Sequence, residues 1–583
     1  MRFSRLSVAF LIATATWAAT PLYPLRDIRP GLKGIGKSVF TGDRIDDFQV
    51  EILGVLENIG PKQSLILARL SGGPLATTGV MQGMSGSPVY IDGALAGAIA
   101  MAFPYSKEPI AGIRPIEEML AIPDIRPPSR ARVSMLDTDL LAGLPKPAEA
   151  MFGSSRLAEI ATPVSFSGFT RATVDHFAPR LRALGLEPIQ GISGGGRTSG
   201  PLGSPSSIQP GSMISVHLVT GDLALGADGT VTLIDEGKLY AFGHRFLSVG
   251  ATDLPFARAE VLTLLPSLAS SFKIAASREL MGVISQDRNT AIAGEFGRRA
   301  AMIPMEISLG GRGAQAREYK MELVHDRFLS PFLLQMILFS TLDSAEHSAG
   351  TGSFAVKGEI EFQGQTPPLR LDNMYAAEGG ALVQASLSTA IPLAYVMQSG
   401  FDALALRRIR LRIESSGEKR QLQIDQVHPS RLQVRPGEPV DVVISLAGEN
   451  GVELPRRISY KVPVGMTPGP LHFTVGDAMS TNLGEFRLLH GVTPRTAAQA
   501  VATVNRLRSN TKAYVRVWRP DPSYQQSGAD LSGPPPSLGM ILARAQSQGG
   551  PVQSFSSKVA EFEVDAGGAL VTGSKTIQVE IKE

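Results

Sequence analysis

The sequence predicts a mainly β protein, and three observations support that fold class. Glycine and proline are plentiful, with 61 and 41 among 583 residues, which is typical of many short strands joined by turns. Apolar and polar residues alternate in stretches such as 48–53 and 440–446, and this period of two indicates strands with one buried face. Hydrophobic residues make up 43% of the chain and charged residues 19%, so the chain can fill buried cores and lacks the composition of a disordered protein.

The first 18 residues have the pattern of a secretory signal peptide. Arg2 and Arg5 precede an apolar run at residues 6–15, and small residues follow that run. The run is shorter than the roughly 20 residues that a membrane-spanning helix needs. We therefore expect a signal peptide at residues 1–18, an exported protein that is periplasmic or extracellular, and no membrane span in the mature chain.

The length suggests about three to five domains, and composition divides the rest of the chain into five segments. These are a serine-bearing β unit (19–125), a mixed connector with a Gly/Ser-rich linker (126–207), a histidine-bearing β unit (208–325), a helix with additional strands (326–411), and an immunoglobulin-like β-sandwich with the C-terminal region (412–583). The sandwich is predicted because the alternating strand at 440–446 follows a turn at 435–438.

Composition also excludes several kinds of site. The chain has no cysteine, which excludes disulfides, thiolate metal sites and a cysteine nucleophile. The net charge is only +3, without a dense basic run, so no nucleic-acid partner is expected. The histidines and carboxylates show no metal-ligand spacing. We expect no metal and no cofactor.

A phosphate-binding pattern, G-x-x-x-x-G-K-S, occupies residues 31–38, but we do not expect it to bind nucleotide. That loop functions only between a buried strand and a helix whose N-terminus faces the phosphates. Here the preceding residues 26–30 are mostly charged, and the following residues alternate as strands do. The pattern is therefore expected to be the glycine-rich start of the first strand.

The run Gly83-Met84-Ser85-Gly86-Ser87-Pro88 is the strongest chemical signal in the sequence. Glycines on both sides of a serine allow a tight turn, from which the hydroxyl projects while backbone N–H groups point to one place. A serine nucleophile needs such donors for the developing oxyanion and a general base within reach. We expect Ser85 as the nucleophile, with Ser87 as the spare, and the N–H groups of Gly83 and Ser85 as the oxyanion hole. The alternative is a plain β-turn before the hairpin at 89–101.

Among the eight histidines, His244 has the most suggestive context. It closes a predicted strand that ends with residues 241–244 and leads into a loop at 245–253. A histidine at a strand end can project into a cleft between two β units. We therefore expect His244 to be the general base, although a packed or exposed histidine is the ordinary role for any single one.

Several of these segments resemble the SpoIVB peptidase family of exported serine peptidases. The resemblance lies in residues 48–52, 82–88, 229–232 with 241–244, and 282–297. It implies a trypsin-like double β-barrel peptidase core, with Ser85 as nucleophile and His244 as general base. Two departures stand out. The serine segment here precedes the histidine segment, a permuted order that the geometry of a triad tolerates, and no Asp or Glu occurs in residues 58–91, where the family has its acid.

Another carboxylate could orient His244 instead, and Asp253 and Asp287 are the candidates, with Asp253 the first choice. A Ser–His dyad is the alternative, and the family's peptide-binding PDZ module is not visible. The function expected is hydrolysis of peptide bonds in a peptide or protein substrate. A catalytically inactive, peptide-binding scaffold of the cell envelope and an exported esterase remain open, as does the oligomeric state.

Overall fold

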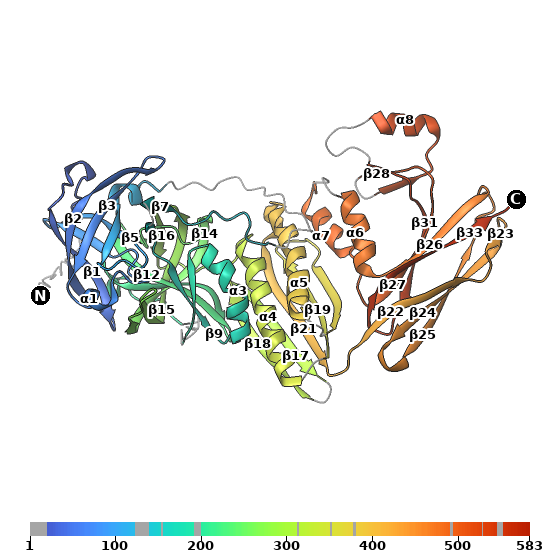
Figure 1. Ribbon diagram of the computed structural model, residues 1–583, viewed down its shortest axis with the longest axis horizontal. Helices are drawn as coiled ribbons and strands as arrows, with labels where there is room; N and C mark the ends of the chain where they lie inside the picture. Colours follow the sequence, from blue (N-terminus) through green and yellow to red (C-terminus); the bar gives the residue numbers. More distant parts are fainter. Residues whose placement is uncertain are drawn as a thin grey trace, which may run out of the picture.

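The computed structural model describes the chain from residue 20 onward, except for residues 123–138, 153–154, 192–199, 312–313, 350–351, 377–379, 490–493, 527–528 and 545–551. The expected signal peptide at 1–18 and part of the expected Gly/Ser-rich linker lie outside the described residues. Figure 1 shows the elements in a row, from the first β unit at one end to a C-terminal β region at the other.

The first β unit is a closed barrel of six antiparallel strands. Its strands, in spatial order, are β4 (Pro88–Ile91), β1 (Lys33–Thr41), β2 (Arg44–Gly60), β3 (Gln63–Ser71), β6 (Ile110–Pro115) and β5 (Ala94–Ala102), and β4 also pairs with β5 to close the barrel. The phosphate-binding pattern runs into β1, which confirms that it begins a strand. The hairpin expected at 89–101 is also confirmed, with Asp92 and Gly93 at φ 50° and 79° in its turn.

A second six-stranded barrel follows. It contains β12 (Ala224–Asp235), β13 (Lys238–Ala241), β16 (Ala291–Phe296), β15 (Phe272–Arg288), β14 (Gly250–Leu265) and β11 (Met213–Gly221), and pairing of β11 with β12 closes it. Two closed antiparallel barrels leave few free strand edges. The mainly β fold class with a double β-barrel is therefore confirmed.

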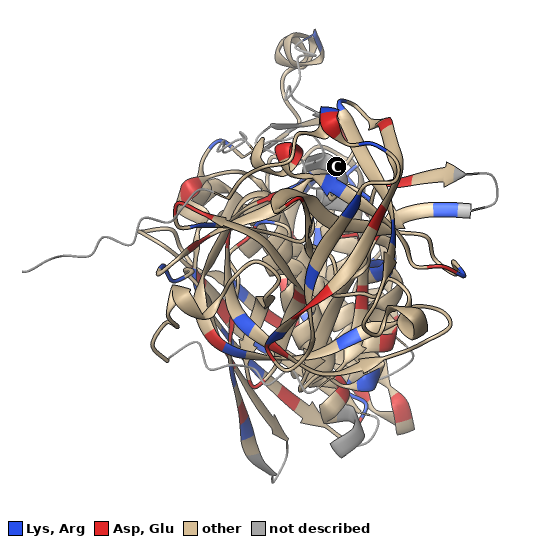
Figure 2. Ribbon diagram, turned by 90° about the vertical axis from the view of Figure 1, so that its left-hand side faces the viewer, with Lys and Arg blue, Asp and Glu red and all other residues tan. Residues whose placement is uncertain are grey.

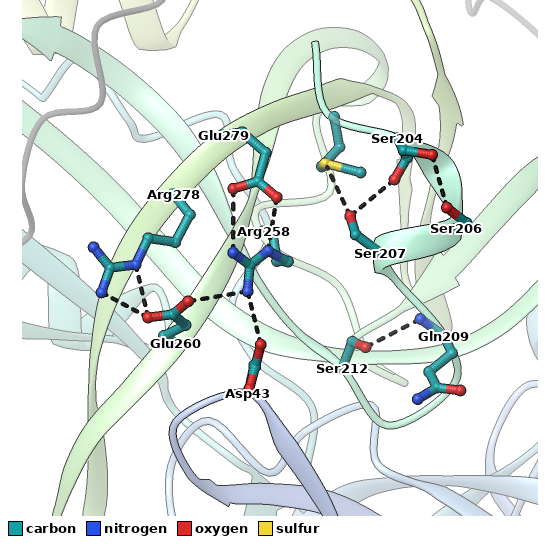
Figure 3. Close-up of polar contacts among 11 residues, drawn as sticks. Asp43, Ser204, Ser206, Ser207, Gln209, Ser212, Arg258, Glu260, Arg278 and Glu279 are labelled. Carbon is teal, nitrogen blue, oxygen red and sulfur yellow. Dashed lines mark hydrogen bonds and ion pairs between the residues drawn. The ribbon is translucent and has the colours of Figure 1, made fainter.

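The two barrels dock along β14 and β15. Gly42, in the β1–β2 turn, exchanges two backbone hydrogen bonds with Val261 of β14. Beside this bridge, Asp43 forms an ion pair with Arg258 at 3.2 Å, and Arg258 also binds Glu279 at 2.8 Å (Figure 3). Asp43 is 70% exposed, so its ion pair adds little stability, and the backbone bridge is the firmer contact.

The sheet of the second barrel continues into a helix-covered layer. Its further strands are β10 (Leu186–Gln190) and β9 (Thr162–Ser167) at one end, and β18 (Ala314–Leu323), β17 (Ile303–Gly311), β21 (Leu406–Ser416), β19 (Ser353–Phe362) and β20 (Leu369–Ala376) at the other. The helices α3 (Arg171–Ala183), α4 (Leu329–Ala349) and α5 (Ala381–Gln398) lie side by side against it (Figure 1). The middle of α4 is buried on all sides, because residues 332–339 are apolar except one glutamine.

The C-terminal region is a β-sandwich with its own apolar core. One sheet contains β25 (Glu453–Lys461), β24 (Pro439–Gly448), β22 (Gln421–Pro429) and β32 (Leu570–Thr572), and the other contains β23 (Gln433–Val434), β33 (Ser574–Ile581), β26 (Gly469–Gly476), β27 (Lys512–Arg519) and β31 (Ser557–Asp565). In β24 every second residue from 440 to 446 is fully buried, as the alternation predicts. Within the described residues, no helix has the length and apolarity needed to span a membrane.

Candidate active site

Ser85 lies in a tight turn between Met81 and the start of β4, as the glycines around it predict. Gly83 and Gly86 have φ of 86° and 92°, a backbone conformation that only glycine adopts without strain. A Cβ atom on Gly86 would lie 2.0 Å from the carbonyl oxygen of Thr230. Glycine at this position therefore permits both the turn and the close approach of the second barrel.

Strand β12 of the second barrel holds the turn by its carbonyl groups. The Thr230 hydroxyl donates to Gly83 O at 2.8 Å, the Thr230 N–H donates to Ser85 O at 2.9 Å, and the Thr232 hydroxyl donates to Gly86 O at 2.7 Å. All five residues are buried. These three bonds occupy carbonyl oxygens of the turn and leave the N–H groups of Gly83 and Ser85 unused.

The N–H groups of Gly83 and Ser85 are the two that sequence reasoning assigned to an oxyanion hole. Neither donates to an acceptor in the described part of the chain. The Ser85 hydroxyl is fully buried and also has no hydrogen-bond partner among the described residues. A free hydroxyl beside two unused N–H donors is the arrangement that stabilises charge on a substrate carbonyl oxygen.

Thr230 also contacts the segment that carries His244. Its carbonyl accepts a hydrogen bond from Phe242 N at 3.2 Å, while its N–H is bonded to Ser85 O. Next in the chain, a Cβ on Gly243 would lie 3.1 Å from the carbonyl oxygen of Ile99, and that same oxygen accepts the Gly86 N–H. The structure thus brings the serine turn and the histidine segment together around Thr230.

The His244 ring is oriented by a backbone carbonyl. Its Nδ1 lies 2.6 Å from Arg245 O, and because a carbonyl can only accept, Nδ1 carries the proton and Nε2 keeps its lone pair. Nε2 is buried without a partner among the described residues, so no hydrogen bond joins it to the Ser85 hydroxyl. The pKa of His244 is lowered to about 4, mainly by burial; the bond to Arg245 O raises it, and the charges of Arg114 and Arg245 contribute to the lowering. The imidazole is therefore neutral at neutral pH, in the tautomer that a general base needs.

Asp253, the first choice for the orienting acid, is bonded to other groups. One carboxylate oxygen pairs with Arg298 at 2.6 Å and the other accepts the Ala301 N–H at 2.7 Å. Since Nδ1 of His244 is bonded to a carbonyl, Asp253 does not orient the ring in this structure. The expectation that Asp253 completes a triad is not met, because Asp253 lies in β14, where its carboxylate binds Arg298 and the Ala301 N–H.

Asp287, the other candidate acid, supports the histidine indirectly. Its buried carboxylate accepts the N–H groups of Phe246 and Leu247, each at 2.8 Å, and of Val249 at 3.2 Å. Burial raises its pKa, and those three hydrogen bonds with the charge of Arg245 act in the opposite direction. Asp287 therefore fixes the loop that directly follows His244, including the carbonyl group that orients the ring.

A direct serine–histidine hydrogen bond occurs elsewhere, between Ser277 Oγ and His217 Nε2 at 3.1 Å. Both residues lie within paired strands, β15 and β11, where backbone N–H groups belong to the ladders. This pair has no turn with free N–H donors, so it lacks the means to stabilise an oxyanion. Burial lowers the pKa of His217 to about 4, as is expected for a histidine packed in the core.

The site is closed to solvent in this structure. Ser85 is 0% exposed and His244 is 2% exposed. A cavity of about 400 Å³ lies next to the histidine loop, lined by Ser248 and Asp287 together with residues of the β2–β3 turn, the end of α2 (Ile116–Leu120) and the β15–β16 turn. Because Ser85 is fully buried, a substrate can reach it only after neighbouring segments move apart. Within the described residues, no group of three or more His, Asp or Glu side chains is arranged to hold a metal ion.

Sequence reasoning did not assign a role to Thr230 and Thr232. The signal for them is present, because residues 229–232 belong to the segments that resemble the SpoIVB peptidase family and both threonines fall on one face of a strand by the period of two. What the sequence lacks is the partner of each hydroxyl, which lies about 146 residues away in the chain.

Comparison with known proteins supports the resemblance for one part of the chain. Residues 20–120 match the family model of the SpoIVB peptidase S55. Neither the curated proteins nor the solved structures include a match. The matched residues span the first barrel and the Ser85 turn, and they end before His244. Over residues 20–120, the chain is therefore similar to the SpoIVB peptidase S55 family.

Proposed function

We propose that this protein is an exported serine endopeptidase that forms an acyl-enzyme on Ser85 with His244 as general base. One observation carries the proposal: Thr230 is bonded on one side to the carbonyls of the Ser85 turn and on the other to the segment that ends in His244. The family match over residues 20–120 supports a peptidase and hence a peptide or protein substrate. Export is supported by the composition of residues 1–18.

The proposed reaction follows from the protonation states. Nε2 of His244 has a lone pair, so it takes the proton as the Ser85 hydroxyl attacks the scissile carbonyl. The N–H groups of Gly83 and Ser85 bind the oxyanion, and the imidazolium then gives its proton to the leaving amine. Water attacks the acyl-enzyme by the same route and releases the second product.

This mechanism uses a dyad held by the backbone. The carbonyl group of Arg245 takes the position that a carboxylate has in a triad, and Asp287 holds that carbonyl's loop. A carbonyl oxygen stabilises the imidazolium less than a carboxylate does, so a modest turnover is expected. Because Ser85 and His244 are buried without a bond between them, the active state also requires an opening that admits substrate and aligns the two side chains.

A catalytically inactive, peptide-binding scaffold is the second candidate, and the same closed geometry favours it. The absence of a carboxylate at His244 Nδ1 and of a Ser85–His244 hydrogen bond is compatible with a turn that persists without catalysis. Such a protein would bind peptides and release them intact.

Incubation of the purified chain with a proteome-derived peptide library, followed by mass spectrometry, separates the two candidates. The peptidase generates new peptide termini that Ser85→Ala abolishes and Ser87→Ala does not redirect. Cleavage that persists in Ser85→Ala refutes the assignment of the nucleophile. Retention of peptides on the immobilised protein without any new termini favours the scaffold.

A further inference from the structure

Behind the Ser85 turn lies a buried chain of three polar side chains that the proposed reaction does not use. Lys273 of β15 is 1% exposed, and its Nζ donates to the Ser38 hydroxyl at 2.9 Å. The Ser38 hydroxyl is in turn 2.9 Å from that of Ser87, and both serines are fully buried. The chain therefore connects a lysine of the second barrel, through β1, to the residue two positions after Ser85.

The same lysine also holds the residues that precede Ser85. The backbone N–H of Lys273 donates to Gln82 O at 3.2 Å, and the backbone N–H of Gln82 donates to Ser271 O at 2.9 Å. The Lys273 side chain also packs against the turn. A Cβ atom on Gly83 would lie 3.2 Å from the Cδ of Lys273. Lys273 thus contacts the start of the turn directly and the end of the turn through Ser38.

Among the described residues, the Lys273 amine has no counter-ion. Besides the Ser38 hydroxyl, the amine faces the Phe40 ring, whose centroid is 5.8 Å away. The charged groups beside Ser38 on β1 and β2 have other partners: Lys37 pairs with Asp47 at 3.7 Å, and Asp46 pairs with Arg44 at 2.8 Å. Burial alone lowers the pKa of Lys273 to about 7. A buried, unpaired amine disfavours the folded state, so an apolar residue of similar length would serve a purely structural purpose better.

We propose that Lys273 is a positioning residue for Ser85, acting through Ser38 and Ser87 on one side and Gln82 on the other to aim the N–H groups of Gly83 and Ser85. This inference rests on the proposed function, since it assigns a role within the same site. Breaking the hydrogen-bonded chain removes the hydrogen bond of the Ser87 hydroxyl and leaves this side of the turn held by Thr232 and by backbone groups. Without it, the two N–H donors diverge and the reactivity of Ser85 falls.

The test compares the rate at which a fluorophosphonate probe labels Ser85 in wild type, Lys273→Met and Ser38→Ala, with Lys37→Met as the matched control. Lys37 precedes Ser38 in β1 but its side chain is 42% exposed, so Lys37→Met should label at the wild-type rate. We expect at least a tenfold slower rate in Lys273→Met and in Ser38→Ala, with a melting temperature no lower than that of wild type for Lys273→Met. The pH profile of wild type should show a transition near pH 7 that Lys273→Met lacks.

A rate within twofold of wild type in either variant, or an unchanged pH profile in Lys273→Met, overturns the proposal while leaving the peptidase function intact. If wild type itself is not labelled, the proposed function fails, and hydrogen exchange decides the role of Lys273 alone. Lys273→Met should then exchange the amides of residues 82–88 at least tenfold faster than wild type does. Equal exchange in the two proteins overturns the positioning role.

Discussion

At the scale of single residues, the chemistry of the site depends on how His244 is kept neutral. A histidine that is buried beside two arginines loses its proton readily, and the pKa of about 4 follows from that environment. The bond from Nδ1 to Arg245 O leaves Nε2 as the acceptor. The residue therefore meets the protonation requirement of a general base over the whole neutral range, even without a carboxylate partner.

Replacing His244 with Gln should change how stability depends on pH. Between pH 4 and the ordinary histidine pKa of 6.5, the folded wild type binds fewer protons than the unfolded chain, so its free energy of unfolding falls as the pH drops through this window. Each unit of pKa corresponds to about 1.4 kcal/mol. We expect wild type to lose up to about 3 kcal/mol relative to His244→Gln between pH 7 and pH 4.

Urea unfolding of both proteins at pH 7 and at pH 4 measures this difference. Other buried titrating groups, such as His217, Asp228 and Asp287, are present in both proteins and cancel in the comparison. A wild type and a variant that lose stability in parallel would show that His244 titrates normally, and hence that it is not buried as described.

The two candidate acids should respond differently to removal of their charge. Asp287→Asn replaces an oxygen that accepts a backbone N–H by an NH₂ group that cannot, so buried donors lose their acceptor. We expect a loss of about 2–4 kcal/mol in the free energy of unfolding and a strong loss of Ser85 reactivity. Asp253→Asn is the matched control, because the Arg298 partner of Asp253 is 44% exposed and a pair of this kind contributes under about 1 kcal/mol. Chemical denaturation with probe labelling checks both, and equal effects of the two variants would contradict the positions assigned to them.

At the scale of secondary-structure elements, β12 connects the two candidate catalytic residues. Thr230 and Thr232 are two residues apart, so both hydroxyls point to the Ser85 turn. The next strand, β13, pairs with β12 and ends just before His244. One hairpin of the second barrel thus fixes the turn and the position of the base together.

Removing either hydroxyl should loosen the turn without altering side-chain volume much. In Thr230→Val the buried Gly83 carbonyl loses its donor, and in Thr232→Val the Gly86 carbonyl does. We expect about 1–3 kcal/mol of destabilisation in each, together with slower labelling of Ser85. Thr220→Val is the control, because Thr220 is 1% exposed in β11 and its hydroxyl has no partner among the described residues.

Thermal or urea unfolding of the three variants provides the comparison. Thr220→Val should be neutral or stabilising, since it removes an unsatisfied buried hydroxyl. Destabilisation of all three variants by the same amount would show that the loss comes from the strand and not from the bonds to the turn.

Many of the strands and turns could be predicted from the sequence, because their conformation depends on local patterns. The period of two gives the strands at 48–53 and 440–446, and Asp92-Gly93 gives the β4–β5 turn, since both residues adopt positive φ. The glycines of residues 83–86 indicate a turn with free N–H groups for the same reason. In each case neighbouring residues determine the conformation.

What the sequence could not provide are the partners across the barrels. The orienting group of His244 is a backbone carbonyl, which every residue has, so no residue type marks it. Asp253 is close to His244 in the sequence, yet it lies in β14, where Arg298 and Ala301 bind it. Lys273 and Ser38 are 235 residues apart, and no local pattern relates them.

At the scale of the whole molecule, the candidate active site lies where two closed barrels meet. The docking contacts include the backbone bridge of Gly42 to Val261 and the bridge of Gln82 to Phe272. Acidic and basic residues are interspersed over the end of the molecule that carries the first barrel (Figure 2), so charge does not direct a single class of ion to this surface. Access to Ser85 is therefore governed by how far the barrels and the histidine loop move apart.

Partial opening should increase the reactivity of Ser85. Because the hydroxyl is fully buried, a probe reacts only with an opened state, and low concentrations of urea raise the population of such states before global unfolding. We expect the labelling rate to rise with urea well below the unfolding transition and to collapse within it. Labelling time courses over a urea series, with circular dichroism on the same samples, measure this, and a rate that follows only the unfolded fraction would contradict an active opened state.

The most direct test of the central claim is fluorophosphonate labelling of the folded protein, with peptide mapping of the modified residue. We predict modification at Ser85 in wild type and, more slowly, in Ser87→Ala, and its loss in Ser85→Ala and His244→Ala. Wild-type protein that remains unlabelled while folded, with or without low urea, or label that maps to another serine, would contradict the assignment of Ser85 and His244 as nucleophile and base.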